Sequence, residues 1–182
     1  MPGRIWQAAF EIALDQHGFV TFENITELGS DPAILRVWNK RGVVEKVGHG
    51  IYRFQGIPAT PLQPYMLATL WPSGRGVLSH DTALELHELC DINPEKIHIA
   101  LPPEYRPRRR GGESYVIHRD KLIEADLTWH DGIRIVTPAK GIEQAMASGV
   151  PRQLVRQALE TATKLGRVSR EKLILLKNQF EK

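Results

Sequence analysis

The sequence predicts an α+β protein in two parts. Three helices followed by a β-hairpin are expected in the first part, and strands followed by helices in the second. Three prolines fall within residues 56–64, a composition that resists both helix and central strand. The chain of 182 residues is long enough for two small cores. We therefore expect a domain over residues 1–56, a linker over 57–64 and a second domain over 65–182.

The first part begins with three expected helices. Residues 5–16 carry apolar side chains at helical spacing, namely Trp6, Ala9, Phe10 and Ala13. A short second helix is expected over residues 22–28, and a glycine follows each of these two helices. Ser30 or Asp31 can cap a third helix over residues 32–41, with proline in its first turn.

Two β-rich runs follow the third helix. Residues 43–47 and 51–54 flank a glycine-containing turn, which predicts a hairpin. Three helices and a hairpin within about 55 residues are the order of a winged helix-turn-helix. In that fold the third helix enters the DNA major groove and the hairpin, or wing, reaches phosphates.

Charge supports a DNA-binding interpretation of this part. Residues 1–31 carry five acids and one basic residue, whereas residues 32–56 carry five basic residues and one acid. A helical wheel places Ile34, Val37, Trp38 and Arg41 on one side of the third helix and Ala33, Arg36, Asn39 and Lys40 on the other. The alternative is an ordinary solvated helix face. The expected DNA contacts are Arg36, Asn39, Lys40, Arg41, Lys46, His49 and Arg53.

The second part is expected to be a mixed α+β domain that ends in helices. Helices are expected over residues 64–71 and from Ser79 or Thr82 to Cys90, with Thr82 and Glu85 as a capping box. Strands are expected over residues 96–101, 114–119, 127–130 and 133–136, the last two as a hairpin. The final helices are expected over residues 138–147, 151–165 and 169–180.

No catalytic or metal site is evident in this pattern. Five histidines of the second part lie on different expected elements without the paired spacing of metal ligands: His80, His87, His98, His118 and His130. Ser79 and His80 are adjacent, so their side chains should point in different directions, and a helix cap explains the serine better than a nucleophile does. Asp126 and Asp131 lack the partners that a two-metal site needs. We expect no enzyme activity and no cofactor.

A basic loop is expected between the first two strands of the second part. It contains Arg106, Arg108, Arg109 and Arg110, and is either a solvated turn or a second contact for an anion. No apolar run approaches the roughly 18 residues of a membrane span, and no secretory signal is evident. A single cysteine, Cys90, agrees with a reducing compartment. We therefore expect a cytoplasmic protein that does not insert in membranes.

Several strings of residues resemble the AbiE-type antitoxins of bacterial abortive-infection and toxin-antitoxin systems. In the first part these are residues 35–42 and 47–52, which are similar to that family's recognition helix and wing. In the second part they are residues 78–84, 97–102, 116–119 and 136–140.

The resemblance implies a repressor that binds the promoter of its own operon. It also implies a nucleotidyltransferase-like toxin, which the antitoxin counters with or without a stable complex. Two alternatives stay open at this point. One is a stand-alone winged-helix regulator whose second domain senses a ligand or dimerises, and the other is a nucleic-acid-processing enzyme. The oligomeric state does not follow from the sequence.

Overall fold

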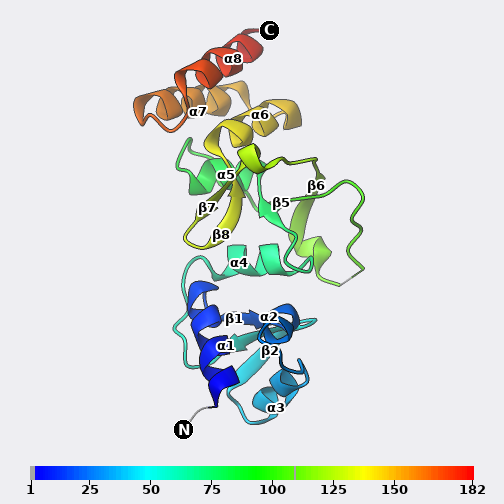
Figure 1. Ribbon diagram of the computed structural model, residues 1–182. Coiled ribbons are helices and arrows are strands. Elements are labelled where there is room, and N and C mark those ends of the chain that lie inside the picture. Colours follow the sequence, from blue (N-terminus) through cyan, green and yellow to red (C-terminus); the bar gives the residue numbers. More distant parts are fainter. Residues whose placement is uncertain (1–2, 109) are drawn as a thin grey trace. The chain divides into compact units, whose positions relative to one another are not determined.

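The computed structural model describes residues 3–108 and 110–182 and has an α+β fold made of two compact units. The first unit ends at Gly74 and the second begins at Arg75 (Figure 1). No helix in the described ranges is long and apolar enough to cross a membrane.

The first unit contains the expected three helices and hairpin. These three helices are α1 (Arg4–Asp15), α2 (Phe22–Glu27) and α3 (Ile34–Lys40), and the hairpin strands are β2 (Val44–Gly48) and β3 (Ile51–Phe54). A further strand, β1 (Phe19–Thr21), pairs with β3, so the small sheet has the order β1-β3-β2 and is antiparallel. Strand β1 was not predicted, because three residues are too few to show a strand period.

Aromatic rings fill the core of this unit. Phe54 of β3 is buried, and the rings of Trp6 and Phe10 from α1 meet its edge at centroid distances of 5.8 and 5.4 Å. Trp38 of α3 approaches the same ring at 6.1 Å. Such aromatic contacts add to the free energy gained by burying apolar surface. The sheet therefore holds α1 and α3 in place through one central side chain.

The proline-rich segment lies in the first unit, together with α4 (Gln63–Leu70). The Gln63 side chain donates to the His17 carbonyl at 2.8 Å, and the Thr60 hydroxyl lies 2.9 Å from the His17 ring. Arg53 donates to the Ile57 carbonyl at 3.0 Å. The structure thus places the boundary after residue 74, whereas the expected linker was 57–64. The composition of residues 57–64 indicated a segment without regular structure, but it did not indicate the hydrogen bonds to His17 and Arg53 that hold this segment on the first unit.

The second unit is built on a five-stranded mixed sheet with the order β6-β5-β4-β8-β7. These strands are β4 (Val77–Leu78), β5 (Ile97–Leu101), β6 (Tyr115–Arg119), β7 (Leu127–His130) and β8 (Ile133–Val136). β5 and β6 are parallel, and β7 and β8 form the expected antiparallel hairpin. β4 was not predicted, although it is the central strand, because two residues carry no periodic pattern.

Four helices complete this unit: α5 (His80–Leu86), α6 (Pro138–Ser148), α7 (Arg152–Lys164) and α8 (Arg170–Glu181). They bury a shared apolar cluster that includes Leu84, Ile142, Leu159 and Leu176. Short 3-10 turns occur at Gly112–Ser114 and Glu124–Asp126. The expected capping box at Thr82 is wrong, because α5 begins two residues earlier and the Thr82 hydroxyl instead accepts the His98 amide at 2.9 Å.

Candidate nucleic-acid interface

The turn between α2 and α3 sets the direction of α3. Thr21 and Asn24 form a reciprocal cap at the start of α2, with the Asn24 amide donating to the threonine hydroxyl at 3.2 Å. Before α3, the Asp31 carboxylate accepts the Ala33 amide at 2.8 Å. Such side-chain bonds satisfy amides that a helix start leaves unpaired. The helix-turn-helix is therefore fixed by its own polar residues.

The outward face of α3 is a continuous stripe that carries three cations. Leu35 and Trp38 are buried, whereas the side chains at positions 33, 36, 37, 40 and 41 are exposed. These positions are three or four residues apart, which places them on one side of a helix. The helical wheel placed Val37 and Arg41 on the same side as Trp38, and this grouping is wrong, because the buried side of α3 is centred on Leu35 and Trp38. We call residues 33, 36, 37, 40 and 41 the outward stripe.

The wing is fastened to both helices of the helix-turn-helix. The Asn39 side chain of α3 accepts the Lys46 amide of β2 at 3.2 Å. The Phe22 amide at the start of α2 donates to the Gly50 carbonyl at 2.9 Å. Gly50 has φ of +70°, and a Cβ there would lie 3.1 Å from the Phe22 ring. Glycine is thus required at the wing turn both by its backbone conformation and by the approach of Phe22.

The structure brings some of the predicted DNA contacts together but not all of them. Lys46 and His49 are exposed on the wing, and the His49 ring lies edge-on to Phe22 at 6.5 Å. Asn39 is exposed, but its carbonyl oxygen is already engaged by the wing. Arg53 is half-buried and donates to the Ile57 carbonyl, and its side chain lies against Gly18. Arg53 therefore lies with the proline-rich segment rather than among the exposed cations.

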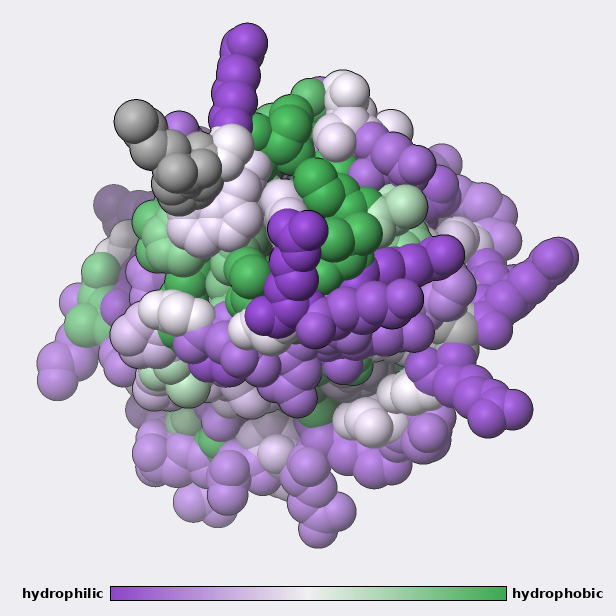
Figure 2. Space-filling view, turned by 90° about the horizontal axis from the view of Figure 1, so that it is seen from below, coloured by the Kyte–Doolittle hydropathy of each residue, from purple (hydrophilic) through white to green (hydrophobic). Residues whose placement is uncertain are grey.

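Four exposed cations lie on α3 and the wing of this unit. Arg36, Lys40, Arg41 and Lys46 form no ion pair within residues 3–108 and 110–182. The acids of the unit are all exposed. Glu11 and Asp15 lie on α1, Glu23 and Glu27 on α2, Asp31 before α3, and Glu45 on β2 of the wing, next to Lys46. Figure 2 views the first unit from the end at which α3 lies and shows hydrophilic side chains around a smaller hydrophobic group. Uncompensated cations on one surface favour binding of a polyanion.

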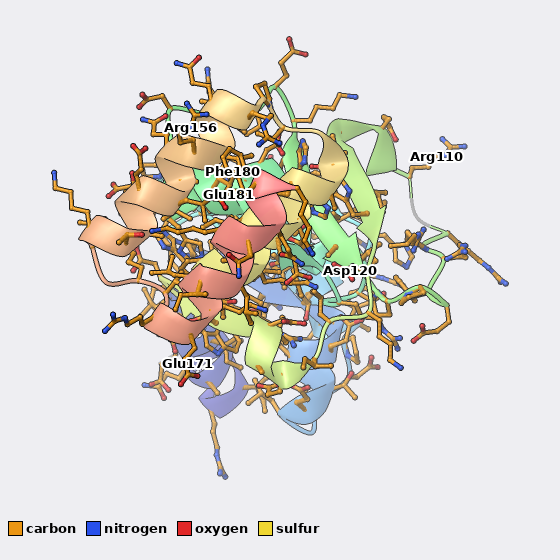
Figure 3. All side chains as sticks on the ribbon, turned by 90° about the horizontal axis from the view of Figure 1, so that it is seen from above. Arg110, Asp120, Arg156, Glu171, Phe180 and Glu181 are labelled. Carbon is orange, nitrogen blue, oxygen red and sulfur yellow. The ribbon has the colours of Figure 1, made fainter. Side chains whose placement is uncertain are left out.

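The basic loop of the second unit joins β5 to β6. The Arg106 guanidinium turns back onto the carbonyls of Pro103 and Tyr105, and Arg119 also donates to the Tyr105 carbonyl. Arg108 and Arg110 are exposed, and Figure 3 shows Arg110 at the periphery of the unit. Arg109 lies outside the described residues. Arg106 is thus committed to the loop's own backbone, while Arg108 and Arg110 extend its charge outward.

Three histidines that are far apart in the sequence form a cluster in the second unit. His80 at the start of α5 stacks on His118 of β6 with ring centroids 3.4 Å apart, and His118 Nε2 lies 3.2 Å from His98 Nδ1 on β5. Burial, and then the neighbouring His118 and His98, lower the pKa of His80 to about 3. Burial also lowers the pKa values of His98 and His118. We call His80, His98 and His118 the histidine cluster, whose rings are neutral at pH 7.

A polar network connects this cluster to α6. The Gln144 side chain accepts the His80 amide at 3.1 Å and donates to the Asp120 carboxylate at 2.7 Å. Lys140 lies 4.0 Å from the same carboxylate and 3.2 Å from Glu143. Sequence reasoning missed the cluster, because nothing in the separate strings around the three histidines indicates that β5 and β6 are neighbours of α5. No group of His, Cys, Asp and Glu in the described ranges is placed to hold a metal ion.

The Ser79 side chain does reach its neighbour, contrary to expectation. Its hydroxyl lies 3.0 Å from His80 Nδ1 and makes no bond to the start of α5. Ser79 does hold the N-cap position of α5, as expected, but its hydroxyl makes no capping hydrogen bond, and the next residue, His80, has a left-handed backbone with φ of 51°. Ser79 is nevertheless fully buried, so a substrate carbonyl cannot reach its hydroxyl. The low pKa of His80 also makes it a weak base.

Helix-turn-helix and wing together define the first unit as a winged helix, a class of fold that binds DNA through its third helix. Residues 7–55 match the model of a family described as "Transcriptional regulator, AbiEi antitoxin". This match confirms, over those residues, the resemblance seen in the sequence. It leaves the second unit unmatched, so the likeness of its strings to the family stays a resemblance.

A solved structure resembles the chain over almost its whole length. It is the crystal structure of the RV2827C protein from Mycobacterium tuberculosis, with a TM-score of 0.55 and 20% sequence identity. The likeness covers 97% of this chain and 72% of that one. At this identity it shows a shared fold. No curated protein matches the chain at a significant level.

Proposed function

We propose that this chain is a DNA-binding transcriptional repressor of the AbiEi antitoxin type, which acts in the cytoplasm on the promoter of its own operon. The observation that carries the proposal is the set of four exposed cations, Arg36, Lys40, Arg41 and Lys46, which form no ion pair with any described residue and lie in a segment that matches this family. Arg36, Lys40 and Arg41 would meet DNA from α3, while Lys46 and His49 would hold phosphates from the wing.

A gel mobility shift with the upstream promoter fragment tests this proposal. Replacing Arg36 and Lys40 with alanine should weaken binding by about one to three kcal/mol if either side chain reaches a base edge. Each phosphate contact that is lost should also lower the slope of log affinity against log salt by about one. A double variant that binds like the wild type across the salt series would show that α3 is not the DNA-binding element.

A matched control removes the same charges elsewhere. Arg170 and Lys177 are exposed on α8 and have no acidic partner in the described parts of the chain. Their double replacement by alanine changes the net charge as much as the α3 variant does. It should leave both the affinity and the salt slope close to those of the wild type. The comparison separates a local contact from a general electrostatic effect.

Arg108 and Arg110 supply a second candidate contact for DNA. They are exposed on the β5–β6 loop, in the unit that does not contain the winged helix. A contact there would add phosphates to the footprint without adding sequence preference. If so, replacing both with alanine lowers the affinity for all duplexes alike and lowers the salt slope, while the preferred sequence is unchanged.

The antitoxin role adds a second activity, opposition to a nucleotidyltransferase-like toxin encoded nearby. It rests on the family match and on the resemblance of the second unit. Expression of the neighbouring gene alone should arrest growth, and co-expression of this chain should restore it. A neighbouring gene without toxicity, together with intact promoter binding, would favour a stand-alone regulator whose second unit senses a ligand or dimerises.

A further inference from the structure

The outward stripe of α3 contains two apolar side chains, Ala33 and the larger Val37. Val37 is 44% exposed, although the opposite side of the same helix buries Leu35 and Trp38. Arg36 precedes it and Lys40 is three residues ahead, so cations flank the valine on the helix surface. A complex that brings phosphates to these cations also brings Val37 against the nucleic acid.

Folding alone does not account for valine at this position. An exposed β-branched residue loses side-chain freedom in a helix, and lysine, glutamate or alanine would be better helix formers there. Burial of Val37 in the free protein is too slight to compensate for this lower helix propensity. Its apolar surface would be removed from water only in a complex.

Asn39, the exposed uncharged polar residue of α3, is poorly placed to read bases. Reading adenine by a pair of hydrogen bonds requires both the oxygen and the nitrogen of an asparagine side chain. The Asn39 oxygen already accepts the Lys46 amide, which holds the wing against α3. Asn39 is thus a positioning residue for the wing. The outward stripe presents three cations, Arg36, Lys40 and Arg41, and the apolar side chains of Ala33 and Val37.

We propose that Val37 contacts the C5 methyl group of a thymine in the major groove and so sets a sequence preference. The inference rests on the proposed DNA binding through α3. Thymine is the base that presents a methyl group in the major groove, and small apolar side chains are the usual contacts for it. Arg36 and Lys40, on either side, are suited to guanine or to phosphates.

The test begins with a selection of preferred duplexes from a random pool, using the full-length protein. Each thymine of the selected site is then replaced singly by deoxyuridine, which removes only the methyl group. At one position we expect the wild-type affinity to fall about fourfold, the effect of exposing one methyl-sized group to water. The Val37→Ala variant should bind the thymine duplex correspondingly less well and should not distinguish thymine from deoxyuridine at that position.

Two further variants make the outcome unambiguous. Val37→Ser leaves a short side chain that has no γ-methyl group and ends in a hydroxyl, and should lose the preference for thymine. Val47→Ala removes an exposed valine from the wing and should keep the preference. Circular dichroism checks that all variants fold, and alanine at position 37 suits a helix.

The possible results separate the two proposals. If the selection yields no enriched duplex and the protein binds no DNA, the proposed function fails and this inference fails with it. If DNA binds tightly but every methyl removal affects the wild type and Val37→Ala equally, the function stands and the role of Val37 is refuted. A preference that both the wild type and Val37→Ser show fully would also refute it.

Discussion

Replacing Gly50 with alanine should destabilise the winged helix by a predictable amount. The left-handed backbone conformation costs an L-residue about 1–2 kcal/mol, while restricting the unfolded chain returns about 0.4–1 kcal/mol. The added Cβ would lie 3.1 Å from the Phe22 ring, which is itself packed on Tyr52 at 5.9 Å and on His49 at 6.5 Å. Overpacking of this kind adds about 1–3 kcal/mol. We expect a total loss of about 2–4 kcal/mol.

Two other glycines of the same unit separate these contributions. Gly42 has φ of +71° and no atom within 4 Å of its added Cβ, so Gly42→Ala should cost only the backbone part, about 1 kcal/mol. Gly56 also has open space around its Cβ and is not in the left-handed region, so Gly56→Ala should be neutral or slightly stabilising. The expected order of destabilisation is thus Gly50, Gly42, Gly56.

Urea unfolding followed by tryptophan fluorescence measures these differences in the full chain. Trp6, Trp38 and Trp71 lie in the first unit, and Trp129 of the second is already 67% exposed, so the signal reports mainly the first unit. If Gly42→Ala and Gly50→Ala lower the free energy of unfolding equally, the Phe22 ring moves away from the added Cβ without an energetic penalty. A Gly50→Ala variant as stable as Gly56→Ala would refute the argument from backbone conformation as well.

Three more predictions concern the second unit and the boundary. Burial lowers the pKa values of the histidine cluster below 6.5, so the unfolded chain binds more protons than the folded chain below pH 6.5. The free energy of unfolding should therefore be unaffected by these histidines above pH 6.5 and should fall as the pH is lowered toward 3. Circular dichroism melts would show this, and His80→Asn, which tolerates the left-handed backbone, should flatten the dependence. A fragment of residues 1–74 should bind DNA and unfold at higher urea than one of residues 1–56, which lacks the partners of His17 and Arg53; an equal midpoint would contradict the packing described. Incubation with labelled DNA, RNA and nucleotides in Mg²⁺, Mn²⁺ or Zn²⁺ should give no turnover, because Asp126 and Asp131 lie at opposite ends of β7, about 16 Å apart along an extended strand; metal-dependent turnover lost in Asp126→Asn would overturn this.

Most of the helices and strands could be predicted from the sequence, because their patterns are local. The hairpin of β7 and β8 has the expected bounds, and an Asp-Gly turn joins its strands. Helix α6 begins at the expected proline and ends before the glycine at position 149. In each case the signal for the element and for its end lies within a few residues of the chain.

Features that depend on distant parts of the chain could not be predicted. The histidine cluster requires β5, β6 and the start of α5 to meet, which the order of elements does not specify. The outward position of Val37 depends on which side of a seven-residue helix the core contacts, and a helix this short has too few apolar residues to decide it. The unit boundary depends on Gln63 and His17, which are 46 residues apart.

The two bonds that fasten the wing, from Asn39 to Lys46 and from Phe22 to Gly50, have a consequence for how the surface meets a ligand. A reading surface that is already preorganised loses little conformational entropy on association. Affinity differences between DNA sequences should then appear mainly as differences in the dissociation rate, since no slow rearrangement precedes docking. Replacing Asn39 with alanine would remove one of these two bonds, loosen the wing and transfer part of the discrimination into the association step.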